Sequence, residues 1–258
     1  MVGIDGSKAA RHAAVWAVQE AVGREIPLRL LCFIDPADLC GADTEHSQFA
    51  AARAALHDAQ RAVEATGEPV KIETEVVVGK PLAELVEQAR SAAMVCVGSI
   101  GIKHVCHGTS SVAAALPGLA LCPVAVIRRP AGRSTTPQVG SIVVEVDNAV
   151  VLQHAFDEAR LRAAPVRAVS ARRANVADDI DGISRRAQAR LNRRIARWTR
   201  LYPDVPVEPI AIRGSVCRYL AADAKSVELF VTGTNGCGNP VGPGPIAFPV
   251  LTVRRNNL

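Results

Sequence analysis

Short apolar segments alternate along the chain with longer segments whose apolar residues recur every three or four positions. The short segments are rich in valine and isoleucine, which is typical of strands buried on both faces. In the longer segments, Ala13, Trp16 and Ala17 share one helical face, as do Leu82 and Leu85. Because parallel strands are joined by helical crossovers, the alternation predicts an α/β fold with a mostly parallel sheet and helices on both faces.

The order of these segments occurs twice. Each half opens with an apolar strand that ends in an aspartate, Val2–Asp5 in the first half and Val143–Asp147 in the second. Each half closes with an apolar strand that contains a proline, Cys122–Ile127 and Phe248–Val253. Matching elements in matching order indicate a tandem duplication.

The spacing of four glycines supports the duplication. Gly98 follows Gly79 by 19 residues, and Gly233 follows Gly214 by the same 19 residues. Between the halves lies a polar stretch of proline, glycine, serine and threonine without apolar periodicity, which is typical of a linker. We therefore expect one domain over residues 1–129, a linker over 130–138 and a second domain over 139–258.

The composition fits a globular protein. Hydrophobic residues make up 49% and charged residues 21% of the 258 residues, and the net charge of +5 is too small to indicate nucleic acid by itself. The seven cysteines form no C-x-x-C pair, and Cys32 and Cys96 lie in apolar segments, which favours a reducing compartment. Without a signal peptide or an apolar stretch of about 18 residues, we expect a cytoplasmic protein that does not enter a membrane.

Seven arginines crowd one predicted helix, and they suggest either a surface for nucleic acid or acidic partners or a solvated helix face. Ile183, Leu191, Ile195 and Trp198 lie at helical spacing in the same segment, so the arginines would cover its outer side. Because no aromatic residue interleaves with the arginines on their side of the helix to stack on bases, we favour the solvated face and expect no nucleic-acid partner. The arginines are Arg185, Arg186, Arg190, Arg193, Arg194, Arg197 and Arg200.

Motifs of catalysis and metal binding are missing from the sequence. It has no G-x-S-x-G, no H-E-x-x-H and no G-x-x-x-x-G-K-[ST], so we expect no catalytic residues and no enzymatic activity. His104, Cys106 and His107 lie close together, but no fourth ligand has the usual spacing, and we expect no metal site.

In open parallel sheets, ligands bind beyond the carboxyl ends of the strands, near the point where the strand order reverses. Asp5 and Gly98 lie at such predicted ends in the first half, and Asp147 and Gly233 lie at the equivalent ends in the second. These positions are the first candidates for a binding site.

Four motifs resemble the universal stress protein family in its tandem two-domain form, as found in mycobacteria and other actinobacteria. They are V-G-I-D-G-S at residues 2–7, V-V-V-G-x-P at 76–81, V-x-V-G-S-x-G at 95–101 and C-P-V-x-V-I-R at 122–128. The resemblance covers almost the whole chain. It implies two Rossmann-like domains of the adenine nucleotide alpha hydrolase-like type, each with an open, mostly parallel five-stranded sheet.

The resemblance also implies a nucleotide site in the first domain. Asp5, with Gly3 and Ile4 before it, matches the aspartate that lies beside adenosine, and Phe33 matches the second-strand residue whose backbone touches adenine. Gly98 and Gly101 match the first two glycines of a G-x-x-G loop that holds the phosphates. Glycines let backbone N–H groups face phosphate, and a following helix N-terminus favours negative charge.

The third glycine of that loop is missing. Family members carry G-S or G-T about twelve residues before C-P-V, and this spacing assigns Ser110 and Ser111, followed by Val112, to the position. A serine still offers a backbone N–H and a hydroxyl, but it does not easily adopt a positive φ. The resemblance thus implies ATP in the first domain through a weakened phosphate loop.

The second copy departs further from the family pattern. Gly233 and Gly236 are retained, but Phe248 follows Gly236 by 12 residues, whereas Cys122 follows Gly101 by 21. Most of the phosphate loop or two turns of its helix are therefore absent, and we expect a degenerate domain that binds no nucleotide.

These features predict a non-enzymatic stress-adaptation protein that acts as an ATP-dependent sensor or adaptor, as a homodimer or with a protein partner. The alternative is a protein-interaction module in which both nucleotide pockets are lost. The sequence leaves both open.

Overall fold

The computed structural model describes residues 1–258 except 40, 100–111, 129–139, 173–179, 235–247 and 255–258. The chain divides into two compact units, Met1–Arg129 and Pro130–Leu258. The linker expected over 130–138 lies outside the described residues.

The first unit contains a five-stranded parallel sheet in the order β3-β2-β1-β4-β5. Its strands are β1 (Val2–Ile4), β2 (Leu28–Ile34), β3 (Ile72–Val78), β4 (Val95–Gly98) and β5 (Val124–Ile127). Its helices are α1 (Lys8–Gly23), α2 (Ala42–Glu64), α3 (Pro81–Gln88) and α4 (Val112–Leu119), with a 3-10 turn η1 (Pro36–Asp38).

The second unit repeats this topology, with the strand order β8-β7-β6-β9-β10. Its strands are β6 (Ser141–Glu145), β7 (Val166–Arg172), β8 (Val207–Arg213), β9 (Val227–Gly233) and β10 (Val250–Val253). Its helices are α5 (Ala149–Leu161), α6 (Ile180–Leu201) and α7 (Val216–Ala222), with a 3-10 turn η2 (Ala224–Ser226). The two sheets correspond strand for strand, as a duplication requires.

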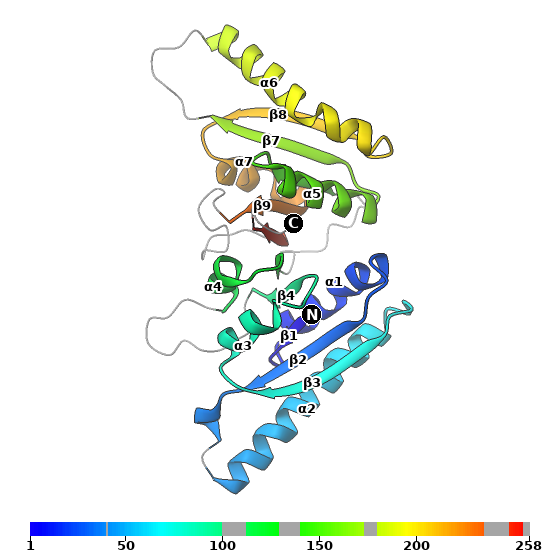
Figure 1. Cartoon of the computed structure of the whole chain (residues 1–258), viewed down its shortest axis with the longest axis vertical. Coiled ribbons are helices and arrows are strands. Elements are labelled where there is room, and N and C mark those ends of the chain that lie inside the picture. Colours follow the sequence, from blue (N-terminus) through cyan, green and yellow to red (C-terminus); the bar gives the residue numbers. More distant parts are fainter. Residues whose placement is uncertain (40, 100–111, 129–139, 173–179, 235–247, 255–258) are drawn as a thin grey trace. The chain divides into compact units, whose positions relative to one another are not determined.

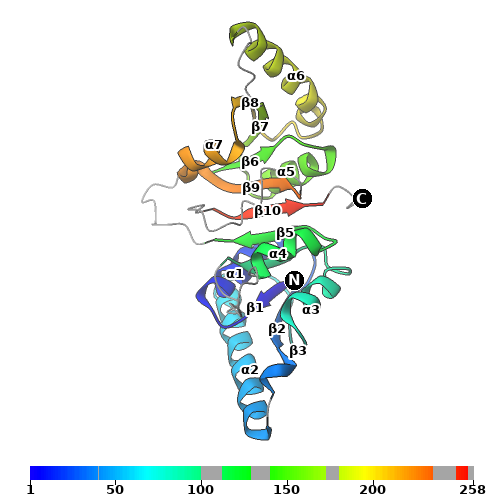
Figure 2. The same ribbon diagram turned by 90° about the vertical axis from the view of Figure 1, so that its left-hand side faces the viewer.

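Helices cover both faces of each sheet. In the first unit α1 packs on α2, which runs along β2 and β3 (Figure 1), while α3 packs on α4. In the second unit α5 packs on α6, and α7 lies on the opposite face of β6 and β9 (Figure 2). This arrangement confirms the fold predicted from the alternating pattern.

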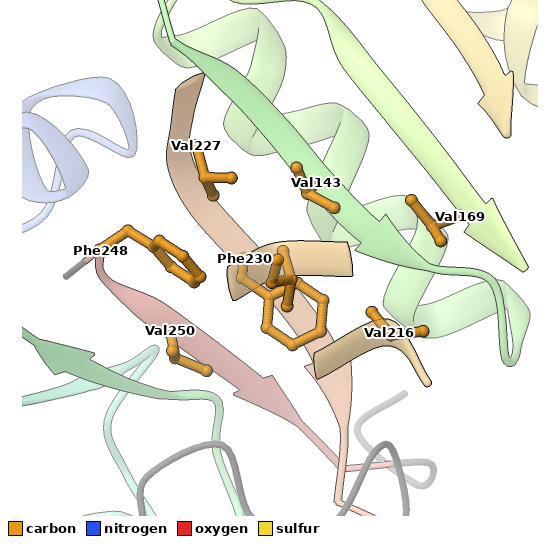
Figure 3. Packing of buried hydrophobic residues seen from close by; sticks show 8 residues of the cluster. Val143, Val169, Val216, Val227, Phe230, Phe248 and Val250 are labelled. Carbon is orange, nitrogen blue, oxygen red and sulfur yellow. The ribbon is translucent and has the colours of Figure 1, made fainter. Parts of the chain in front are cut away.

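The core is mainly aliphatic. In the second unit α7 contributes Val216 to a cluster that includes two of the five phenylalanines, Phe230 of β9 and Phe248 just before β10 (Figure 3). The remaining buried members come from four strands and α7: Val143, Val169, Leu220, Val227 and Val250. Cys32 and Cys96 are buried in the first unit, as small core residues.

Helix α6 is amphipathic, as its spacing predicts. Leu191, Ile195 and Trp198 are buried, and the seven arginines between positions 185 and 200 are exposed. The Trp198 ring lies 5.8 Å from that of Phe156 on α5, and Tyr202 completes the cluster at 5.2 Å from Phe156. Packing against β8 and α5 therefore holds this helix, and its arginines lie on the exposed side, where Arg194 donates its Nη2 to Asp147 O at 2.5 Å. No helix of the described residues is long and apolar enough to cross a membrane.

Candidate functional site

The sheet register of the first unit brings three predicted site residues to neighbouring strand ends. Ile4 lies beside Cys32 in the parallel pair β1–β2, so Asp5 and Phe33 follow side by side. Val2 lies beside Cys96 in the pair β1–β4, and the same register places Ile4 beside Gly98. The strand order reverses at β1, between β2 and β4, which is where open α/β sheets bind ligands.

Asp5 forms the turn between β1 and α1. Its Oδ1 accepts a hydrogen bond of 3.0 Å from the backbone N–H of Ser7, and Ser7 in turn caps α1 by accepting from Ala10 N at 3.1 Å. Between them Gly6 has a φ of +76°, a left-handed conformation that glycine adopts without strain. The sequence D-G-S thus fixes the carboxylate at the end of the strand and starts the helix.

The second carboxylate oxygen of Asp5, Oδ2, is buried and has no hydrogen-bond partner among the described residues. Buried polar atoms are nearly always paired, because leaving one unpaired costs the free energy of its desolvation. The atom is therefore a hydrogen-bond acceptor whose donor is not among the described residues.

The Cys32 thiol lies close enough to Asp5 to respond to its charge. Burial raises the pKa of Cys32 to about 11, and the negative charge of Asp5 adds to the increase. The thiol is therefore protonated at neutral pH and is not a ready nucleophile.

Gly98 is buried at the end of β4, directly against the first turn of α1. A Cβ atom there would lie 2.6 Å from the carbonyl carbon of Ala9 and 2.8 Å from the nitrogen of Ala10. The close approach of strand and helix thus requires glycine at this position, whether or not its backbone also faces a phosphate.

We expect Gly98→Ala to destabilise the first unit by about 1–3 kcal/mol, because the added methyl group meets backbone and forces β4 and α1 apart. Gly3→Ala on the neighbouring strand is the matched control, since its Cβ would meet nothing closer than 3.6 Å. Denaturant unfolding followed by Trp16 fluorescence in a Trp198→Phe background would measure both variants. If the two variants were equally stable, β4 and α1 would be able to move apart at Gly98 without a cost in stability.

The other predicted site residues divide into those that the structure places and those that it does not describe. Gly3 and Ile4 are buried in β1, Phe33 is half-buried near the end of β2, and Val112 is buried at the start of α4. Gly101, Ser110 and Ser111 lie outside the described residues, as do His104, Cys106 and His107. Their assignment stays a prediction. Within the described ranges, no group of histidine, cysteine and acidic side chains could hold a metal ion.

The equivalent position in the second unit is internally bonded. Asn148 follows Asp147 directly, caps α5 by accepting from Val151 N at 3.0 Å, and donates its Nδ2 to Asp147 Oδ2 at 3.2 Å. A Cβ on Gly233 would lie 3.1 Å from the same Oδ2. The carboxylate is turned toward the end of β9 and has a partner within the chain.

Sequence reasoning missed this difference, although the sequence carries it. The first unit reads Asp5-Gly6-Ser7, whereas the second reads Asp147-Asn148 and begins its helix one residue earlier. The shorter turn replaces the glycine by an amide side chain that reaches the carboxylate. The same feature could have been found by aligning the helix caps of the two halves.

Geometrically, the first unit offers a half-buried carboxylate with an unsatisfied acceptor, a close-packed glycine on the adjacent strand and a half-buried aromatic residue on the other side. Such a set can bind a polar group with hydrogen-bond donors beside an apolar ring. Neither Ser7 nor Cys32, the two neighbours of Asp5 described above, is an activated nucleophile, because Ser7 accepts a capping bond and the Cys32 thiol is protonated.

Comparison with known proteins places the chain among relatives of one kind. The model of the universal stress protein family matches residues 1–128. The universal stress protein Rv3134c of Mycobacterium tuberculosis (strain ATCC 25618 / H37Rv) is 56% identical over 259 residues, which cover 100% of this chain and 96% of that protein. A second relative of the same strain, Rv2028c, is 43% identical over 90% of this chain and 84% of its own length.

One solved structure shares the fold over almost the whole chain. A universal stress protein from Archaeoglobus fulgidus DSM 4304 aligns with 98% of this chain and 95% of its own, with a TM-score of 0.69 and 14% identity. A universal stress protein in complex with cAMP aligns with 48% of this chain at 26% identity, with a TM-score of 0.39.

Proposed function

We propose that this chain, which belongs to the universal stress protein family, is a stress-adaptation protein. Its first unit binds the adenine nucleotide ATP. The second unit is a divergent copy that binds none. The protein acts as a cytoplasmic sensor or adaptor without an enzymatic step.

The observation that carries the proposal is the asymmetry of the two aspartates. Asp5 Oδ2 is buried without a partner in the described residues, while Asp147 Oδ2 accepts a bond from Asn148. A ligand with a hydroxyl or amino donor would satisfy Asp5, and the ribose and adenine of a nucleotide both carry such donors. The same ligand would have to displace Asn148 in the second unit.

The surroundings of Asp5 support a binding role over a catalytic one. Binding changes the hydrogen bonding at the start of α1 and at the end of β4, and these segments can pass the change to the surface by shifting the population of conformers. In this scheme the occupied and empty proteins present different surfaces to a protein partner or to a second copy of the chain.

Isothermal titration of the full chain with ATP tests the proposal directly. At a protein concentration of about 100 µM, dissociation constants in the micromolar range give measurable heat, and we expect one site per chain. Mass spectrometry of the denatured protein would reveal nucleotide that co-purifies. Absence of heat and of co-purified nucleotide would favour the alternative, a protein-interaction module with both pockets lost.

A further inference from the structure

The outer strands of the two sheets, β3 and β8, occupy equivalent positions. They differ in what covers their outer edges. In β3 the odd-numbered residues face β2, because Lys71 O accepts from Leu28 N at 2.8 Å and Gly79 N donates to Ile34 O at 2.9 Å. Backbone groups alternate along a strand, so those of the even residues, Thr74 and Val76 among them, face away from the sheet. Such free edges are templates for another strand.

The second unit closes its edge from within. Gln188 of α6 donates its Nε2 to Pro209 O at 2.7 Å, and its Oε1 accepts from Ala211 N at 3.2 Å. Pro209 also removes one outward N–H, which is a common way to block an edge strand. The carboxamide and the proline together leave little of β8 for another chain to pair with.

The duplication identifies the residues of α2 and β3 that are equivalent to Gln188 and Pro209. The buried residues of α2 and α6 have the same spacing, and Phe49 lies three residues before Ala52 as Gln188 lies three residues before Leu191. Counted back from Gly79 and Gly214, Thr74 and Val76 match Pro209 and Ala211. The first unit therefore has a phenylalanine in place of the capping glutamine and a threonine in place of the proline.

A hollow of about 440 Å³ lies at this place, between α2 and β3. It is lined by Phe49, Arg53, Leu56 and His57 of α2 and by Thr74 and Val76 of β3, among others. Its volume is in the range of ligand pockets. Among the described residues, nothing bonds to the outward N–H and C=O groups of Thr74 and Val76.

We propose that an extended segment of a partner protein binds in this groove as an added parallel strand on β3. In the second unit Gln188 donates to one carbonyl and accepts from the N–H two residues further on. One residue of a parallel strand supplies this same pair of bonds, so the internal copy shows which chemistry fits the edge. A side chain of that strand on the α2 side enters the hollow against Phe49 and Leu56.

The charges of β3 permit such pairing. Glutamates on an edge strand often discourage association, but Glu73 is paired with Lys71 at 2.7 Å and Glu75 with Arg29 at 3.0 Å. The edge thus carries balanced charge, and we expect the partner segment to be selected by the side chain that enters the hollow, whose lining also includes the polar residues Gln60 and Glu75. Neither Asp5 nor Gly98 takes part, so the groove is independent of the nucleotide site.

The test uses the full chain without nucleotide and a displayed library of random peptides about twelve residues long, enough to span a strand of five or six. We expect enriched peptides that bind the wild-type chain and bind Phe49→Gln about tenfold or more weakly, because the new carboxamide caps the edge as Gln188 does. Phe49→Leu keeps the apolar wall without the amide, and it should retain binding. Thr74→Pro copies Pro209 and should weaken binding without disturbing the pairing with β2.

Hydrogen exchange gives a second readout on the same complex. A bound peptide should slow exchange at the amides of Thr74 and Val76, and not at those of Glu73 and Glu75, which already face β2. Failure of the library to enrich any peptide, or equal binding to wild type and Phe49→Gln, would overturn the proposal. A wild-type dimer that Phe49→Gln dissociates would also overturn it, by assigning the groove to a second copy.

Discussion

Replacing Asp5 by asparagine should lower the affinity of the chain for ATP by about 10- to 100-fold, the usual cost of one hydrogen bond to a charged group. Asparagine keeps Oδ1, which accepts from Ser7 N, and puts an amide that cannot accept in place of Oδ2, which has no partner among the described residues. Isothermal titration of the variant and the wild type would measure the difference.

The second unit supplies the matched control. Asp147→Asn changes the equivalent atom, which already has Asn148 as a partner, and should leave ATP affinity unchanged. The stability of Asp5→Asn is a second readout, because a purely structural role of Asp5 would predict that the variant is less stable than the wild type. Without nucleotide, Asp5→Asn should leave the first unit as stable as before or more stable, because a buried unpaired carboxylate oxygen is costly. Unchanged ATP affinity in Asp5→Asn would refute the assignment of the ligand to this carboxylate.

Removal of Arg162 should destabilise the second unit by about 3–5 kcal/mol, because it takes away the ion-pair partner of the buried Glu158 carboxylate. Arg162 Nη1 is paired with Glu158 four residues earlier on α5, and the two side chains are 2% and 0% exposed. Burial raises the pKa of the Glu228 carboxyl, and the positive charge of Arg162 acts in the opposite direction. Arg162→Met keeps an unbranched apolar stem and removes the charge.

The double variant Glu158→Leu/Arg162→Met removes both charges. It therefore separates the cost of losing one partner from the contribution of the ion pair to the free energy of unfolding. We expect it to recover most of the lost stability, since well-packed apolar residues often replace a buried ion pair without loss. Denaturant unfolding followed by Trp198 fluorescence in a Trp16→Phe background would report on the second unit.

The first unit contains a more exposed version of the same pair. Glu20 and Arg24 of α1 have side chains that are 6% and 28% exposed, so Arg24→Met should cost less than Arg162→Met. Equal costs at the two positions would mean that burial does not determine the effect.

Much of the fold could be predicted because its causes are local and periodic. Valine-rich segments such as Val143–Asp147 and helical spacing such as that of Leu191, Ile195 and Trp198 are visible in the sequence. The repeat of the opening and closing strands predicted two sheets of one topology, and the structure has them. Parallel strands end at one edge, so the neighbourhood of Asp5 and Gly98 could also be predicted.

The details of the candidate site could not be predicted, because they depend on atoms that meet only after folding. The resemblance assigned Gly98 to phosphate, and the structure adds a steric cause in the backbone of Ala9 and Ala10. The repeated Glu-x-x-x-Arg pattern is in the sequence, but only the packing makes Glu158 and Arg162 inaccessible to water.

By itself the sequence determined an α/β duplication with an aspartate at the end of each first strand, because hydrophobic periodicity and strand direction require no knowledge of distant contacts. Only the tertiary structure decided that Asp5 Oδ2 is buried without a partner among the described residues, and that Gln188 closes one sheet edge while Phe49 lies at the equivalent place of the other. Whether a hydrogen bond forms depends on differences of a few tenths of an ångström in the distance between donor and acceptor, and packing sets that distance.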